Sequence, residues 1–293
     1  MQITAAMVKE LRERTSAGMM ECKKALTAAD GDMEAAVEAM RKSGAAQADK
    51  VAGRTAADGV VVIAMSDDGH KVAMVEVNCQ TDFVAKDEGF TAFSKMVADQ
   101  VLSSGVTDVE ALSAATVGEN TIEEQRQTLI GKIGENIKVR RVHFQETANG
   151  VFGAYQHGVK IGVLTELDGG DQNLAKDISM HVAASRPVCV AESDVPADLI
   201  EKEKEIFTAQ AIESGKPPEI AEKMVTGRLR KYLAEITLLG QPFVKDPDQT
   251  VEKLLAAAGA KAVSFTRFEV GEGIEVEEED FAAEVMKQVK GDD

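Results

Sequence analysis

Two glycine-rich loops are the first candidates for chemistry in this sequence. Residues 153–160 read GAYQHGVK, which is close to the spacing of a phosphate-binding loop. The run lacks the Gly-Lys-Ser/Thr ending, and we predict a strand rather than a helix after it. No helix N-terminus would therefore be available to hold a phosphate. A second glycine pair flanks Glu272, whose charge would repel phosphate, so neither loop predicts a nucleotide site.

The other reactive side chains do not form a catalytic pattern. The four histidines lack metal-ligand spacing; they are His70, His143, His157 and His181. With 50 Asp and Glu residues, pairs of carboxylates are expected by chance. The cysteines, Cys22, Cys79 and Cys189, are odd in number and far apart, which favours free thiols in a reducing compartment. We therefore expect a protein without catalytic residues, metal or cofactor, and an unidentified hydrolase is the weaker alternative.

One polar segment, residues 78–86 (NCQTDFVAK), stands out because it follows a predicted buried strand. It places a single large aromatic residue, Phe83, at a strand-to-helix turn. In one interpretation, Thr81 or Asp82 caps the following helix and Phe83 packs into the core as a hydrophobic staple. In the other, Phe83 is exposed on a rigid turn and inserts into a partner protein.

Composition narrows the class of partner. The chain has 293 residues, of which 44% are hydrophobic, and a formal net charge of −17. That charge repels phosphate backbones, and aromatics at 4% leave few rings for stacking on bases, so direct nucleic-acid binding is not expected. The N-terminus lacks the apolar core of a signal peptide, and no apolar run is long enough to cross a membrane. We therefore predict a cytoplasmic protein without membrane contact.

Helical periodicity predicts three short helices between residues 4 and 43. The second covers 19–28, and Asp32 caps the third, which we expect Gly44 to end. The alanine-rich stretch 45–58 is predicted to be a linker.

The middle of the chain contains two copies of one α+β pattern. In the first copy, two β-branched runs at 60–64 and 72–77 precede a helix at about 86–101. A second helix, with a capping box formed by Thr121 and Glu124, then leads to another strand. Residues 149–151, 160–164 and 175–177 repeat the motifs at 58–60, 71–75 and 85–87. This self-similarity predicts two related lobes packed side by side.

A helical hairpin is predicted within the second lobe. Residues 214–218 (SGKPP) separate two amphipathic helices, and a strand at 263–270 follows the hairpin. An acidic turn at 277–280 then begins a C-terminal helix, where negative charge suits the helix dipole.

Six segments, in order along essentially the whole chain, resemble signature segments of elongation factor Ts. They are LRERTSAGMMECKKAL (11–26), EVNCQTDFVAKDEGF (76–90), AYQHGVKIGVL (154–164), AEKMVTGRLRKY (221–232), LLGQPFVKDP (238–247) and RFEVGEGIE (267–275). The resemblance implies an α+β fold with antiparallel sheets, beginning with a three-helix module similar to ubiquitin-associated domains. The expected units are that module with its linker (1–55), core lobe N (56–148), core lobe C (149–191 and 237–272), the helical hairpin (192–236) and a C-terminal helical module (273–293).

The resemblance also implies a function. Members of this family are guanine nucleotide exchange factors that bind GDP-bound elongation factor Tu and promote release of GDP and Mg²⁺. They then hold the nucleotide-free form until GTP enters, which supports translation elongation. A hairpin arm can in addition join two copies of the chain as a homodimer. The main alternative is an adaptor whose ubiquitin-associated-like module binds peptides, and a nucleotide-release assay separates the two.

The resemblance assigns partner contacts to three regions. The turn that meets the GTP-binding domain comprises Thr81, Asp82, Phe83 and Val84. In it, Phe83 enters between two helices and Asp82 disturbs the Mg²⁺ site. The other contacts are Arg12, Met19 and Met20 in the N-terminal module and His157 in the second lobe, although core packing remains open for His157. Because Met19 and Met20 are adjacent on a helix, we expect one in the core and the other exposed.

Overall fold

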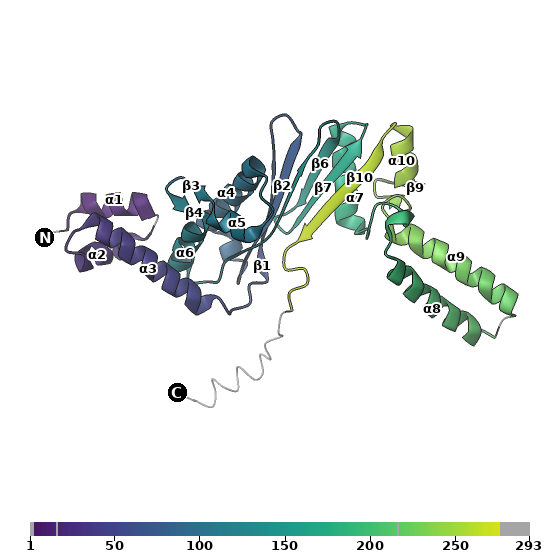
Figure 1. Cartoon of the computed structure of the whole chain (residues 1–293), viewed down its shortest axis with the longest axis horizontal. Helices are drawn as coiled ribbons and strands as arrows, with labels where there is room; N and C mark the ends of the chain where they lie inside the picture. Colours follow the sequence, from purple (N-terminus) through teal and green to yellow (C-terminus); the bar gives the residue numbers. More distant parts are fainter. Residues whose placement is uncertain (1–2, 16, 216, 276–293) are drawn as a thin grey trace, which may run out of the picture.

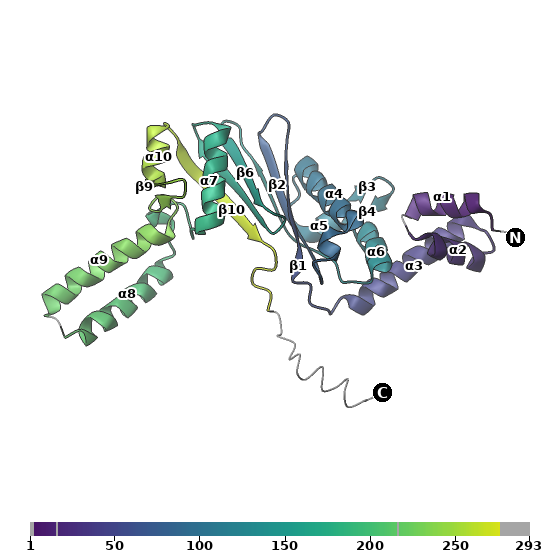
Figure 2. The same cartoon turned by 180° about the vertical axis from the view of Figure 1, so that it is seen from behind.

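The computed structural model describes residues 3–15, 17–215 and 217–275, and its elements are arranged along one long axis (Figures 1 and 2). Three N-terminal helices lie at one end, a β-sheet core lies in the middle, and a helical hairpin projects from the other end. The predicted α+β class is confirmed. The predicted C-terminal helix lies outside the described residues.

The N-terminal module has a small apolar core of its own. Its helices are α1 (Ala5–Thr15), α2 (Met19–Ala28) and α3 (Met33–Val51). The module is filled by buried side chains from all three helices, including Leu11, Cys22, Leu26 and Ala36. Asp32 caps α3 as predicted, accepting a hydrogen bond from the Ala35 backbone at 3.0 Å.

The prediction that Gly44 ends the third helix is wrong, because α3 continues to Val51. Gly44 instead lies where α3 crosses α6 (Ile122–Ile133), opposite Gly131. A Cβ atom at Gly44 would come within 3.0 Å of the Gln127 carbonyl oxygen, so glycine allows the helices to approach closely. The alanines that follow are strong helix formers and sustain the helix. The predicted linker shortens accordingly.

Each lobe contains a three-stranded antiparallel sheet of the same topology, which confirms the predicted duplication. Lobe N has the order β1-β2-β5, with strands Asp58–Met65, Lys71–Cys79 and Lys138–Glu146. Lobe C has the order β10-β7-β6, with strands Lys261–Glu269, Ile161–Asp168 and Val151–His157. Helices α4 (Glu88–Ser104) and α5 (Val109–Ala114) pack on the first sheet, and α6 packs against α3, α4 and α5. Helix α7 (Gln172–Ser185) packs on the second sheet.

The free faces of the two sheets pack against each other and form a shared core. Its buried residues are Val61, Val72 and Met74 from lobe N and Phe152, Leu164 and Phe268 from lobe C. Gly162 lies in this seam, where an added Cβ would come 2.5 Å from a methyl group of Val61. Such a close approach requires glycine, and burial of both faces joins the lobes into one body.

A buried ionic cluster strengthens the same junction. Glu76 on β2 is fully buried and pairs with Arg140 and Arg141 of β5. It also accepts a hydrogen bond from the Gly271 backbone at 2.9 Å, and the Arg141 guanidinium lies 4.2 Å from the ring centroid of Phe268. Burial alone would raise the pKa of Glu76, but the hydrogen bonds from Gly271 and Arg141 hold it below its ordinary value. The carboxylate therefore stays charged and links the lobes.

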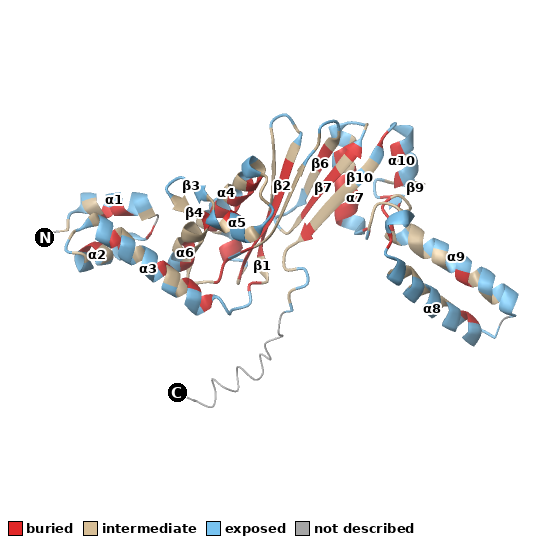
Figure 3. Cartoon of the chain, viewed as in Figure 1, coloured by how far each residue is buried: buried red, intermediate tan, exposed pale blue. Residues whose placement is uncertain are grey.

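The predicted helical hairpin is inserted between α7 and β10, as expected. It consists of α8 (Ala197–Glu213) and α9 (Pro218–Ile236), which pack on each other with an edge-to-face contact between Phe207 and Tyr232. Most of its surface is exposed (Figure 3). The two chain segments at its base lie side by side, because Leu238 donates a backbone hydrogen bond to the Cys189 carbonyl at 2.9 Å.

Several short elements were not predicted. They are α10 (Val251–Ala257), the 3-10 helices η1 (Val84–Lys86) and η2 (Glu192–Asp194), and strands β3 (Thr116–Val117), β4 (Asn120–Thr121), β8 (Pro242–Phe243) and β9 (Asp246–Thr250). None of the helices in the described part of the chain has the length and apolar character needed to cross a membrane.

Candidate functional site

The turn between β2 and α4 presents Phe83 to solvent. The Phe83 side chain is 81% exposed, whereas its neighbour Val84 is buried in lobe N at 8%. The interpretation of Phe83 as a hydrophobic staple is therefore wrong, and Val84 is the residue that anchors the turn. An isolated, exposed phenyl ring on a short turn is suited to insertion into a partner.

A carboxylate from a distant part of the sequence holds this turn in place. One oxygen of Glu135 accepts hydrogen bonds from the backbone N–H groups of Gln80 and Thr81, both at 3.1 Å. Its other oxygen accepts the Thr81 hydroxyl at 2.7 Å. One interpretation expected Thr81 or Asp82 to cap α4, and this is wrong. The cap is Asp87, whose carboxylate accepts a hydrogen bond from the Phe90 backbone N–H at 3.0 Å.

Two further contacts restrain the start of the turn. The Gln80 side-chain oxygen accepts the Asn136 backbone N–H at 2.9 Å. The thiol of Cys79 donates to the Thr81 carbonyl at 3.2 Å. Burial, together with the negative charges of Asp58 and Glu135, raises the pKa of Cys79 to about 12, so the protonated thiol is the form present.

Asp82 is exposed and ion-paired within the turn. Its carboxylate lies 2.7 Å from the ammonium of Lys86. The hydrogen bond from Lys86 lowers the pKa of Asp82, so the carboxylate is ionised at neutral pH. Because both side chains are largely solvated, the pair is weak and Asp82 can exchange Lys86 for another cation.

The N-terminal module exposes both of its adjacent methionines. Met19 is 53% exposed and Met20 is 77% exposed, so the prediction that one of them enters the core is wrong. The α2 side chains buried in the core of the module are instead Cys22 and Leu26, which lie one turn apart. Arg12 is also exposed, on α1.

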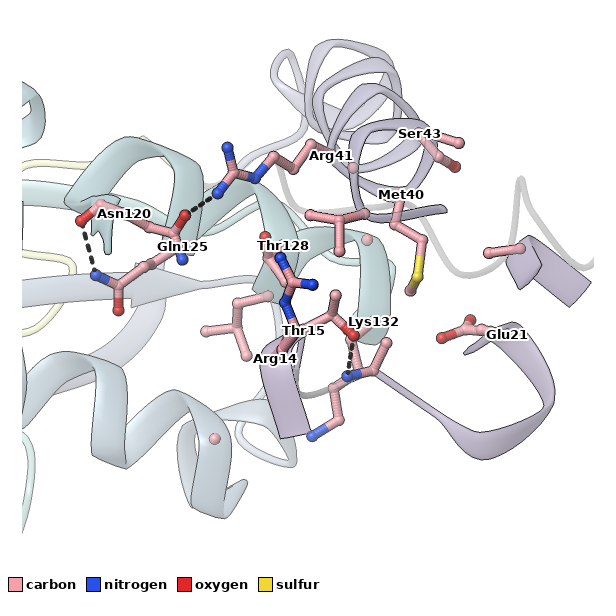
Figure 4. Close-up of a pocket in the computed structure, with 18 of the residues that line it drawn as sticks. Arg14, Thr15, Glu21, Met40, Arg41, Ser43, Asn120, Gln125, Thr128 and Lys132 are labelled. Carbon is pink, nitrogen blue, oxygen red and sulfur yellow. Dashed lines mark hydrogen bonds between the residues drawn. The ribbon is translucent and has the colours of Figure 1, made fainter. Parts of the chain in front are cut away.

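A groove of about 740 Å³ separates the N-terminal module from lobe N (Figure 4). Its walls come from α1, α2, α3, α4 and α6, and Met40 of α3 and Lys132 of α6 are among the residues that line it. Arg41 reaches across to hydrogen-bond Asn120. Sequence reasoning missed this groove, because its walls come from segments far apart in the chain.

His157 lies at the end of β6 and is exposed, so core packing is excluded for it. Its ring stacks on Tyr155, and the Tyr155 hydroxyl lies 3.3 Å from the His157 Nδ1 atom. The neighbouring Gln156 side chain donates to the Val61 carbonyl at 2.6 Å, which ties this corner of lobe C to β1. His157 is thus presented on a well-anchored hairpin, in a different lobe from Phe83.

The glycine-rich run at residues 153–160 leads into a strand, as predicted. Residues 153–160 form the end of β6 and its turn into β7. Among residues 3–15, 17–215 and 217–275, no group of three or more His, Cys, Asp or Glu side chains is arranged to hold a metal ion. The exposed residues described above are suited to contacts with another protein.

Comparison with known proteins identifies the family. The sequence model described as elongation factor TS matches residues 80–272. The chain is 65% identical over 292 residues to the elongation factor Ts of Thioalkalivibrio sulfidiphilus, covering 99% of this chain and 100% of the relative. The chain belongs to the elongation factor Ts family. It is also 60% identical to the elongation factor Ts of Methylococcus capsulatus over 291 residues, or 99% of each chain.

Membership in the elongation factor Ts family confirms the resemblance found in the six sequence segments. The region matched by the family model begins at Gln80, the residue that opens the Phe83 turn, and includes lobe C with His157. Full-length relatives extend the similarity over the N-terminal module, which carries Arg12, Met19 and Met20.

Proposed function

We propose that this chain is a guanine nucleotide exchange factor for elongation factor Tu. It binds the GDP-bound form, promotes release of GDP and Mg²⁺, and holds the nucleotide-free form until GTP enters. The observation that carries this proposal is Phe83, an exposed aromatic ring on a turn restrained by Glu135. Family membership supports the choice of partner.

The free energies require several contacts rather than one. A nucleotide held at nanomolar strength is bound by about 12 kcal/mol. Burial of one phenylalanine contributes only about 1.5–3 kcal/mol. The factor must therefore bind the empty partner far more tightly than the GDP-bound one. By linkage, GDP lowers the affinity of the partner for the factor by the same ratio as the factor lowers its affinity for GDP.

Each of the expected contact residues has a role in this scheme. Phe83 inserts into the GTP-binding domain while Thr81 and Val84 anchor its turn, and Asp82 presents a carboxylate near the Mg²⁺ site. The second set of contacts comprises Arg12, Met19 and Met20 in the N-terminal module and His157 in lobe C. No covalent bond is made or broken in exchange, so the function uses no catalytic residue and no cofactor.

The hairpin arm is a candidate contact between two copies of the chain. Ile206, Ile212 and Ile220 are exposed along it. Exposed aliphatic side chains on paired helices can pack against a second copy of the same surface in a two-fold dimer. A mass measurement by light scattering tests this, and a monomer at high micromolar concentration would contradict it.

A nucleotide-release assay tests the exchange function. Elongation factor Tu loaded with fluorescent GDP is mixed with excess unlabelled GDP, with and without the purified chain, in a stopped-flow instrument. Acceleration by substoichiometric amounts of the chain is expected. An unchanged rate would favour the adaptor alternative. The chain alone should bind neither GDP nor GTP, and binding of either at micromolar strength would also count against the proposal.

The proposed setting is translation in the cytoplasm, with a protein rather than nucleic acid or membrane as partner. The net charge of −17 supports this choice, since it opposes binding to phosphate backbones. We also expect the chain to co-purify with elongation factor Tu, and we expect excess GDP to abolish this co-purification.

A further inference from the structure

We propose that Glu135 is the positioning residue of the Phe83 turn, and that its carboxylate sets the direction in which the phenyl ring projects. This inference rests on the proposed exchange function. Glu135 is not placed in contact with the partner; it acts through the turn.

The sheet restrains the backbone only as far as the start of the turn. The pairing of β2 with β1 and β5 ends at Cys79 and Asn78, immediately before the turn. The next two backbone N–H groups, of Gln80 and Thr81, are both taken up by the Glu135 carboxylate at 3.1 Å. Hydrogen bonds to a charged acceptor are stronger than those between neutral groups, so this carboxylate continues the restraint beyond the strand.

The residues on either side of Glu135 are themselves held in place. It follows Gly134, which ends α6 in a left-handed conformation with a φ of 84° and donates to the Ile130 carbonyl at 2.7 Å. It precedes Asn136, a buried residue whose side-chain amide donates to the Ala52 carbonyl at 3.2 Å and to the Arg54 carbonyl at 2.7 Å. The carboxylate therefore projects from backbone anchored on both sides.

The orientation of the Phe83 ring depends on the backbone of the turn. Because its side chain is 81% exposed, packing within the free protein does little to orient the ring. The direction of the ring must come from the backbone of the turn, and three of the contacts that hold that backbone end on Glu135. Without them the turn samples other orientations, and only the fraction in the competent one can insert.

The expected effect has an upper limit. If Glu135→Ala leaves a tenth to a third of turns competent, GDP release from elongation factor Tu slows roughly three- to tenfold. The decrease in the GDP release rate cannot exceed the decrease caused by Phe83→Ala, because Glu135 acts only through this ring. Glu135→Gln should stay within about twofold of the wild type, since its amide oxygen can accept both backbone N–H groups and its NH₂ group can donate to the Thr81 hydroxyl oxygen.

A double-mutant cycle on the full chain tests the proposal. Release of fluorescent GDP is measured for the wild type, Glu135→Ala, Phe83→Ala and the double variant, with rates corrected to the folded fraction seen by circular dichroism. The double variant should match Phe83→Ala alone, which a purely structural role of Glu135 would not produce. Asp108→Ala is the matched control: its carboxylate accepts the Ala111 backbone at 2.7 Å to cap α5, away from the turn. It should melt earlier and exchange normally.

Three results would overturn the inference: multiplicative slowing in the double variant, Glu135→Gln as slow as Glu135→Ala, or equal slowing by Asp108→Ala. The second of these would show that the charge acts directly rather than by positioning. Should Glu135→Ala not fold, Thr81→Val enters the same cycle. It removes the hydroxyl contact with Glu135, together with the longer hydrogen bond that the hydroxyl accepts from the Val84 backbone at 3.4 Å. A Phe83→Ala variant with unchanged release would instead overturn the proposed function, and the inference with it.

Discussion

The exposure of Phe83 leads to a quantitative prediction for Phe83→Ala. Complete burial of a phenylalanine contributes about 1.5–3 kcal/mol. With 81% of the side chain exposed, only about a fifth of that contribution, roughly 0.3–0.6 kcal/mol, belongs to the stability of the free protein. The melting temperature should therefore fall by no more than about 2 °C. The remaining four fifths, about 1.2–2.4 kcal/mol, is available to the partner, and its loss slows GDP release roughly 8- to 60-fold.

Stopped-flow release of fluorescent GDP, run beside thermal melts of the same proteins, checks both numbers. Phe90→Ala is the contrasting control, because Phe90 is fully buried in lobe N and its truncation costs about 3–5 kcal/mol of stability. Its exchange should fall only in step with the unfolded fraction. A Phe83→Ala variant that melts early yet exchanges normally per folded molecule would refute the reasoning.

Asp82 provides a companion measurement in the same assay. Asp82→Ala should slow release less than Phe83→Ala, and the difference from the wild type should shrink when Mg²⁺ is removed by a chelator. The reason is that the proposed role of the carboxylate is at the ion. An effect of equal size with and without chelator would place Asp82 elsewhere in the interface.

Three other predictions concern the rest of the molecule. Because both methionines are exposed, Met19→Ala and Met20→Ala should each weaken partner binding in a calorimetric titration while leaving the thermal melt almost unchanged; a stability loss without an affinity loss would contradict this. Removal of residues 192–236 with a short Gly-Ser join should leave a folded, exchange-active core, since the segments at the hairpin base are hydrogen-bonded neighbours; collapse of the circular dichroism signal would show that the arm is integral. Burial lowers the pKa of His181, so protons bind preferentially to the unfolded chain below about pH 6.5 and stability falls there. His181→Gln should flatten this part of the pH profile of melting temperature, and an unchanged slope would exclude His181 as its source.

Features that depend on local chemistry were predictable from the sequence. The capping box of Thr121 and Glu124 lies at the start of α6, and Asp32 lies at the start of α3, as expected. The duplicated strand-turn-strand-helix pattern identified both lobes, because each copy carries its own turn and cap signals. These signals act between residues a few positions apart, so no tertiary information is needed to recognise them.

Features that depend on tertiary contacts were not predictable in the same way. Gly44 has the sequence context of a helix end, but its role is to let α3 cross α6 at Gly131. Whether Phe83 or its neighbour Val84 enters the core depends on how the turn meets lobe N. Glu135 is one of many carboxylates in the chain and lies 54 residues from Thr81, so no spacing rule indicates that the two meet.

The packing of the two sheets against each other has a mechanical consequence. Phe83 belongs to lobe N and His157 to lobe C, and the seam between them is closed by apolar side chains and the buried charge of Glu76. The distance between these two proposed contact points is therefore fixed by the packing of the lobes. A chain with this fixed distance can make both contacts at once only on a partner whose domains have the matching spacing. In the proposed exchange function, it is then the partner's domains, and not the two lobes of this chain, that must change their relative positions when the nucleotide leaves.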